Sequence, residues 1–132
     1  MAVRWYSVVI DCRDVAAQAR WWAAALGWAV VYEAPDEVVI VPQAAMDPAN
    51  HPPPGGDGPG PGLVFVTVPE GKQVKNRLHL DLAAWAGEDQ QSEVDRLVSL
   101  GATRVDVGQG DQPWAVLADP EGNEFCVLSS RD

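Results

Sequence analysis

The chain contains the same pattern twice, and this repeat limits its possible folds more than any other feature of the sequence. Residues 14–32 (DVAAQARWWAAALGWAVVY) and residues 89–107 (DQQSEVDRLVSLGATRVDV) each read as a helix, a closing Leu-Gly pair and a β-rich run. An apolar strand precedes each helix, SVVIDC in the first copy and RLHLDL in the second. Paired modules commonly form a cavity between their sheets, so the repeat also predicts where a site would lie.

Alternating apolar residues and turn signals extend each copy into the order β-α-β-β-β. The chain has 132 residues, which is enough for a real core in one domain. We therefore predict an α+β fold in which two βαβββ modules, of about residues 1–70 and 75–132, form an open barrel-like cleft within a single domain. The predicted strands cover residues 4–12, 28–33, 37–41, 63–68, 77–82, 103–107, 114–118 and 124–129.

A long segment between two strands of the first module is rich in proline and glycine. Residues 43–62 include HPPPGGDGPGPG at positions 51–62, which offers too few apolar side chains to fold on its own. We interpret it as a surface loop, either a lid over a site or an insertion without a role there.

Charge and cysteine content restrict the classes of function. The net charge of −10 disfavours nucleic acid and anionic membranes as partners, and it attracts small cations, although a solvated acidic surface explains it equally well. Cys12 and Cys126 lie far apart in apolar strands, as expected for reduced, buried thiols. The N-terminus does not resemble a signal peptide, and no apolar run approaches the ~20 residues of a membrane helix. A cytoplasmic protein with a small-molecule partner is expected.

Side-chain alternation along the strands predicts which residues share a face. One apolar set from each strand is expected to pack beneath a helix. These sets are Val8 and Ile10; Val64, Val66 and Val68; Leu78, Leu80 and Leu82; and Phe125 and Val127. The opposite positions then face a common concave surface, with Phe65 as an apolar wall. That surface collects Ser7, Asp11, Phe65, His79, Asp81, Glu124 and Cys126.

The pairing of His79 with Glu124 has two interpretations. Imidazole and carboxylate groups on separate strands are suitable ligands for a divalent metal ion, and either group can serve as a general acid or base. Alternatively, the two side chains hydrogen-bond each other or reach solvent at the mouth of the cavity.

Several segments together resemble a known superfamily. They are IDCRD before the first helix, ARWWAAALGW, VPEGKQVKNRLHLDL, LVSLGAT and LADPEGNEFCVL, and they span nearly the whole chain. The chain resembles the glyoxalase/bleomycin resistance/extradiol dioxygenase superfamily, also called the vicinal oxygen chelate (VOC) proteins, and more narrowly its glyoxalase-like domain proteins. This resemblance implies two βαβββ modules around a cleft.

The resemblance also implies where a metal would be held. Family enzymes often place one ligand on the first and one on the last strand of each module, which here means Ser7, Leu63 or Phe65, His79 and Glu124. Of these, His79 and Glu124 alone are good ligands. Two alternatives follow: one divalent metal ion at His79 and Glu124, with Asp11 or Asp81 as a further ligand outside the family pattern, or no metal at all. Glu124 is the expected catalytic residue, and the expected ligand-binding residues are Trp5, Ser7, Asp11, Phe65 and Asp81.

Three classes of function follow from these features. The first is a glyoxalase-like enzyme, metal-dependent or acid-base, of the lyase or dioxygenase-like kind. The second is a metal-free protein that sequesters cationic aromatic compounds, as bleomycin-resistance proteins do, with Trp5, Trp21 and Trp85 free to line a cleft. The third is a non-catalytic domain with a vestigial site. In each case exposed strand edges favour a homodimer.

Overall fold

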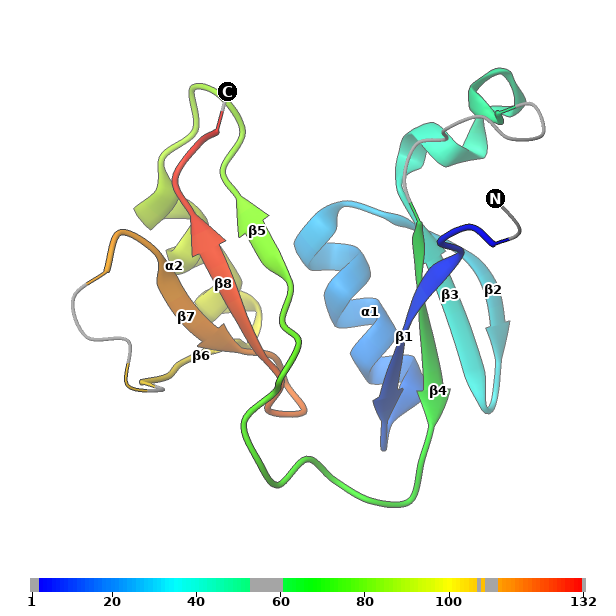
Figure 1. Cartoon of the computed structure of the whole chain (residues 1–132), viewed down its shortest axis with the longest axis horizontal. Coiled ribbons are helices and arrows are strands. Elements are labelled where there is room, and N and C mark those ends of the chain that lie inside the picture. The colour runs from blue at the N-terminus through cyan, green and yellow to red at the C-terminus, as the bar shows by residue number, and fades with distance from the viewer. Residues whose placement is uncertain (1–2, 53–60, 107, 109–111, 132) are drawn as a thin grey trace. The chain divides into compact units, whose positions relative to one another are not determined.

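The computed structural model describes residues 3–52, 61–106, 108 and 112–131. The chain divides into two compact units, Met1–Gly71 and Lys72–Asp132. Each unit contains a mixed four-stranded sheet and an α-helix (Figure 1). The predicted α+β class with two βαβββ modules is therefore confirmed.

The first unit follows the predicted order and adds two short helices before its last strand. Its sheet has the order β1-β4-β3-β2, in which β1 and β4 run parallel and the other neighbours antiparallel. The elements are β1 (Ser7–Cys12), α1 (Val15–Leu26), β2 (Ala29–Ala34), β3 (Glu37–Val41), the 3₁₀ helices η1 (Gln43–Met46) and η2 (Pro48–Asn50), and β4 (Gly62–Thr67).

Local chemistry sets both ends of α1. Asp14 caps its start, because a side-chain oxygen accepts a hydrogen bond from the Ala17 amide at 3.1 Å. Gly27 ends it in the left-handed conformation, with φ of 67°, where a side chain would be strained.

One face of the first sheet forms the core of its unit. Phe65 pairs with Ile10 of β1 and with Val38 of β3, so these three side chains share a face. Phe65 has 0% of its surface exposed, and helix α1 packs on β3 and β4. The expectation that Phe65 faces away from the helix is wrong. Both alternating sets of β4 are apolar, so alternation did not distinguish them, and the larger side chains occupy the core.

The second unit repeats the topology of the first with shorter strands. Its sheet has the order β5-β8-β7-β6, in which β5 and β8 run parallel and the other neighbours antiparallel (Figure 1). The elements are β5 (Asp81–Ala83), α2 (Gln90–Leu100), β6 (Thr103–Arg104), β7 (Ala115–Ala118) and β8 (Glu124–Leu128). Val107, predicted to end β6, lies outside the described residues.

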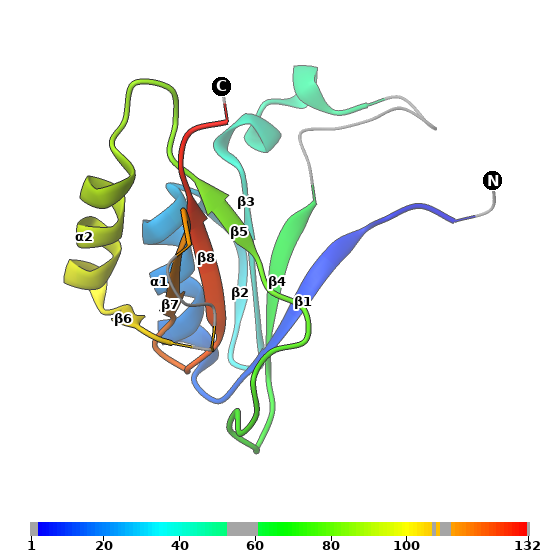
Figure 2. The same cartoon turned by 60° about the vertical axis from the view of Figure 1, so that its left-hand side comes forward.

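Helix α2 covers one face of this second sheet (Figure 2). It is capped by Asp89, which accepts a hydrogen bond from the Ser92 amide at 2.9 Å. Gln90 ties the first turn to β8 by donating to the Val127 carbonyl at 2.9 Å. Phe125 and Val127 are 1% and 2% exposed. The prediction that these two side chains pack beneath the helix while Glu124 and Cys126 face the opposite way is confirmed by this burial and by the strand register.

The segment before β5 differs from the predicted strand of residues 77–82. Strand β5 begins only at Asp81, and the Leu78 side chain is 90% exposed instead of lying under the helix. Pairing with β8 extends back only to Leu80, whose carbonyl accepts from the Cys126 amide at 3.0 Å. His79 therefore lies in an irregular segment at the entrance to β5.

The turn between β7 and β8 fixes the start of the strand that carries Glu124. Asp119 is 4% exposed, and its carboxylate accepts hydrogen bonds from the amides of Glu121 (3.0 Å) and Asn123 (2.9 Å). Gly122 adopts a φ of 88°. The Asp119 carboxylate and the positive φ of Gly122 together hold residues 119–123 in a tight turn.

Candidate functional site

A cavity of about 440 Å³ lies in the second unit, within the part of the chain that the structure describes. It opens on the face of the second sheet opposite α2. Its apolar lining comes from Trp114, Val116, Phe125 and Leu128, and its charged and polar groups come from Lys75, His79, Asp81, Glu124, Cys126 and Arg131.

Strand register brings the polar groups of this cavity together. Asp81 of β5 lies directly opposite Cys126 of β8, and Val116 of β7 lies opposite Cys126 on its other side. Neighbouring residues in register share a face, so one short row crosses three strands. His79 precedes Asp81 by two residues and reaches the same row.

His79, Asp81 and Cys126 form a close cluster. The Nδ1 atom of His79 is 3.0 Å from a carboxylate oxygen of Asp81 and 3.9 Å from the sulfur of Cys126. One donor atom from each residue lies within 4.8 Å of the other two. The His79 and Asp81 side chains are 43% and 49% exposed, so solutes can reach them.

The thiol of Cys126 is kept protonated by its surroundings. Burial raises its pKa, and the negative charge of Asp81 raises it further, while Lys75 opposes these effects. Cys126 is 8% exposed and forms part of the cavity wall. Without a bound cation, the thiol is therefore a poor nucleophile at neutral pH.

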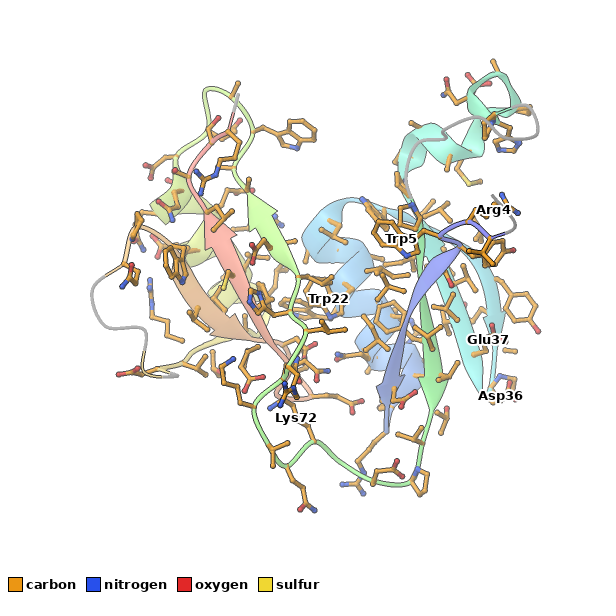
Figure 3. The ribbon with its side chains drawn as sticks, in the orientation of Figure 1. Arg4, Trp5, Trp22, Asp36, Glu37 and Lys72 are labelled. Atoms are coloured by element: carbon orange, nitrogen blue, oxygen red, sulfur yellow. The ribbon has the colours of Figure 1, made fainter. Side chains whose placement is uncertain are left out.

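Glu124 is held by two partners at the start of the second unit. One carboxylate oxygen accepts a hydrogen bond from Lys72 Nζ at 2.9 Å, and the other accepts from the Asn76 amide at 3.0 Å. The two side chains of this ion pair are only 14% (Glu124) and 18% (Lys72) exposed. Lys72, labelled in Figure 3, also donates to the Val74 carbonyl, so Glu124 fixes the segment 72–76 to the start of β8.

These contacts also set the protonation of Glu124. Burial alone would raise its pKa, but the hydrogen bonds from Lys72 and Asn76, together with the charge of Lys72, outweigh it and leave the pKa below its ordinary value. Glu124 is thus an ionised carboxylate with two donors, and this arrangement weakens it as a base. Its predicted catalytic role stays a prediction.

The remaining predicted residues belong to the first unit. Ser7 and Asp11 lie on β1, on the face opposite Ile10, where Ser7 is half-buried and Asp11 exposed. Trp5 precedes β1 and is 73% exposed (Figure 3). Phe65 is enclosed in the core of its own unit and cannot contact a ligand without rearrangement. The ligand-binding roles of Ser7, Asp11 and Trp5 stay predictions.

The metal site implied by the family pattern does not fit these residues. Leu63 and Phe65 carry no donor atoms and lie in the core, and Glu124 already forms an ion pair with Lys72. His79 is the one position of that pattern whose side chain is a good ligand and lies beside other donors. Those donors, Asp81 and Cys126, are on positions that the family pattern does not use.

Sequence reasoning missed several residues at this site, among them Trp114, Arg131, Lys75 and Lys72. Trp114 precedes β7 and Arg131 follows β8, and both line the cavity. Trp114 lies two residues before Val116, so alternation along this strand could have indicated it. Lys75 also lines the cavity, and Lys72 holds Glu124. Lys72 is 52 residues from Glu124 in the sequence, and no local pattern indicates that contact.

Two βαβββ units, one with a polar cavity on the open face of its sheet, define an α+β protein of the VOC type. A family model described as "Glyoxalase-like domain" matches residues 7–128. The chain belongs to the glyoxalase-like domain family. No curated protein matches the sequence at a significant level. Within the described residues, no helix has the length and apolar character that crossing a membrane requires.

Solved structures show the same fold at low sequence identity. A glyoxalase/bleomycin resistance protein/dioxygenase family enzyme from Burkholderia phytofirmans is 18% identical, with a TM-score of 0.65 over 93% of this chain and 95% of that one. The fosfomycin resistance protein FosX from Listeria monocytogenes is 11% identical, with a TM-score of 0.67 over 98% and 93%. A FosX mutant from that organism was solved with Mn(II) and 1S,2S-dihydroxypropylphosphonic acid (11% identical, TM-score 0.66, covering 98% and 92%).

Proposed function

We propose that this chain is a glyoxalase-like protein that binds a small organic molecule in the cavity of its second unit. The cavity itself is the observation that supports this function most strongly. Its volume of about 440 Å³ lies within the range of small-molecule sites, and a few polar groups converge on apolar walls. The sequence predicted a small-molecule cleft between the two modules, whereas this proposal uses a cavity within the second unit alone.

The charges around the cavity favour a ligand with an anionic or oxygen-rich end and an apolar body. Lys75 and Arg131 line it, and Lys72 already neutralises Glu124. Trp114, Val116 and Leu128 offer apolar surface for the rest of the ligand. The FosX mutant structure contains a small phosphonic acid, which is a ligand of this chemical class in a protein of the same fold. Small hydroxy or oxo acids match both requirements.

In this proposal Glu124 organises the site. It holds the segment 72–76 in place, and this segment leads into Lys75 and His79 of the cavity wall. With no metal ion bound to them, His79 and Asp81 are accessible ionisable groups for proton transfer to or from a bound substrate.

A metal-free binder of aromatic cations is the second candidate. Trp5 and Trp85 are 73% and 79% exposed, and the chain carries a net charge of −10. Exposed indole faces attract cations by about 0.5–1 kcal/mol each. Trp21, which was also expected to be free, is only 8% exposed and packs edge-on against Trp22 with ring centroids 5.1 Å apart.

The indole resonances of the tryptophans distinguish these two candidates. In ¹H–¹⁵N NMR spectra, we expect benzoate and phenylphosphonate to shift the indole signal of Trp114. That signal is identified by its absence from the spectrum of the Trp114→Phe variant. Lys75→Met should weaken that response, and Val74→Met, at an exposed neighbouring position, should not. Shifts of Trp5 or Trp85 by bleomycin, without any anion response at Trp114, would favour the second candidate and overturn the first.

A further inference from the structure

We propose that His79, Asp81 and Cys126 bind one thiophilic divalent metal ion, of the Zn²⁺ or Co²⁺ kind, in the wall of the second unit's cavity. The proposal adds a cofactor to the small-molecule site and in that respect rests on the proposed function. This ligand set differs from the expected pair of His79 and Glu124. Cys126, which lies two residues further along the same face of β8, takes the place of Glu124.

The distances in the cluster are close to those of a metal site. Ligand bonds of about 2.0–2.3 Å in a tetrahedral zinc site place the donor atoms roughly 3.3–3.6 Å apart. The His79–Asp81 and Cys126–His79 distances here are 3.0 and 3.9 Å, and no pair of donors exceeds 4.8 Å. Small side-chain rotations are enough to reach ligand geometry.

The contacts argue against a catalytic triad of the same three residue types. In a Cys-His-Asp triad, one imidazole nitrogen contacts the nucleophile and the other contacts the orienting carboxylate. Here both Asp81 and Cys126 approach the same nitrogen, Nδ1 of His79. The three donors therefore converge on a common point, as ligands of a single ion do.

The scaffold and the donor types indicate which ion would bind. Asp81 and Cys126 are paired in the parallel β5–β8 ladder, so their backbone positions are fixed by the sheet. A sulfur, an imidazole nitrogen and a carboxylate oxygen favour Zn²⁺ or Co²⁺ over Mg²⁺ and Ca²⁺, which prefer oxygen ligands alone. Three protein ligands leave one tetrahedral position open, as in catalytic zinc sites. That position would face a molecule bound in the cavity.

Cobalt absorption provides a direct test. Chelator-treated protein is titrated with Co²⁺, and bound metal is counted by elemental analysis after gel filtration. We expect one Co²⁺ per chain, with a sulfur-to-cobalt charge-transfer band and the visible bands of tetrahedral Co²⁺. Cys126→Ser should abolish the charge-transfer band, and His79→Ala and Asp81→Asn should each weaken binding at least about 10-fold.

Cys12→Ser is the matched control, because Cys12 is the other buried thiol and lies in the first unit. It should retain the band. Circular dichroism establishes that each variant is folded. Asp81→Asn changes a half-exposed side chain, so it remains informative should Cys126→Ser unfold. Absence of the band in the wild type, or its loss in Cys12→Ser but not in Cys126→Ser, would overturn the metal site.

The two proposals can fail separately. A benzoate response at Trp114 without the cobalt band would retain the small-molecule site and refute the metal. A cobalt band without any anion response would retain the metal and refute the small-molecule site.

Discussion

At the scale of single residues, Glu124 and Cys126 show how two neighbouring positions on one strand face take different roles. Glu124 accepts two hydrogen bonds and is largely covered, whereas Cys126 adjoins His79 and Asp81 in the cavity wall. Both had been expected on a common concave face. The contact with Lys72 is what distinguishes Glu124 from a free ligand or base.

Replacing Glu124 by Gln tests its structural role. The change leaves Lys72 mostly buried without its counter-charge, so we expect the free energy of unfolding to fall by about 1–3 kcal/mol. Urea denaturation followed by circular dichroism measures this. Glu88→Gln, at an exposed position, should change it by less than about 0.5 kcal/mol. Equal effects of the two substitutions would show that the ion pair contributes little.

The pH dependence of stability tests the same contact independently. The pKa of Glu124 is lower in the folded chain than its ordinary value of 4.5. Its contribution to stability is therefore present above pH 4.5 and is lost as the pH falls through the lowered pKa. Urea midpoints measured from neutral pH to below 4.5 should fall more steeply for the wild type than for Glu124→Gln. Parallel curves would contradict this account.

At the scale of elements, the β3–β4 pair depends on a close backbone approach at Gly62. A Cβ atom there would lie 2.9 Å from the Ile40 carbonyl oxygen and 3.1 Å from a side-chain carbon of Val41. We expect Gly62→Ala to force the strands apart and to lower the free energy of unfolding by about 1–3 kcal/mol.

Gly71→Ala serves as the comparison for this prediction. Its Cβ would be 3.4 Å from a flexible atom of the Arg13 side chain. Calorimetry should show a clear loss of melting temperature for Gly62→Ala and little change for Gly71→Ala. A Gly62→Ala variant as stable as the wild type would mean that the two strands can separate at no cost.

The strands also show what the sequence can and cannot predict. In β8, Glu124 alternates with the aromatic and aliphatic side chains of Phe125 and Val127, so the faces were predicted correctly. In β4 both sets are apolar, and Phe65 was assigned to the wrong face. The segment 77–80 has strand-like alternation, yet the segment before it is fastened by Glu124, and Leu78 is exposed. Local patterns contain no information about such distant contacts.

The cluster at the site depends on the same kind of information. Alternation placed His79, Asp81 and Cys126 on one expected surface, but their close approach requires the pairing of Asp81 with Cys126 in β5–β8. The repeat predicts that these strands exist, and it does not fix their register. Expectations taken from the family pattern therefore emphasised Glu124, whereas the contacts of the folded chain favour Cys126 as the partner of His79.

At the scale of the whole molecule, strand edges bear on the predicted homodimer. In the first unit β2 is an edge strand, and its Val30, Val31 and Tyr32 side chains are 42%, 44% and 53% exposed. An apolar edge favours pairing with a second copy. We expect light scattering to give twice the mass of the chain, and Val31→Lys to shift the protein toward monomer. Val74→Lys, at a 77% exposed position outside the strands, should not. A monomeric wild type would refute the dimer.

Anomalous X-ray diffraction from crystals of the cobalt-loaded protein would locate the ion among the candidate ligands. We expect one anomalous peak within bonding distance of His79, Asp81 and Cys126, with the Lys72–Glu124 ion pair intact. A peak between His79 and Glu124, with Lys72 displaced, would contradict this prediction.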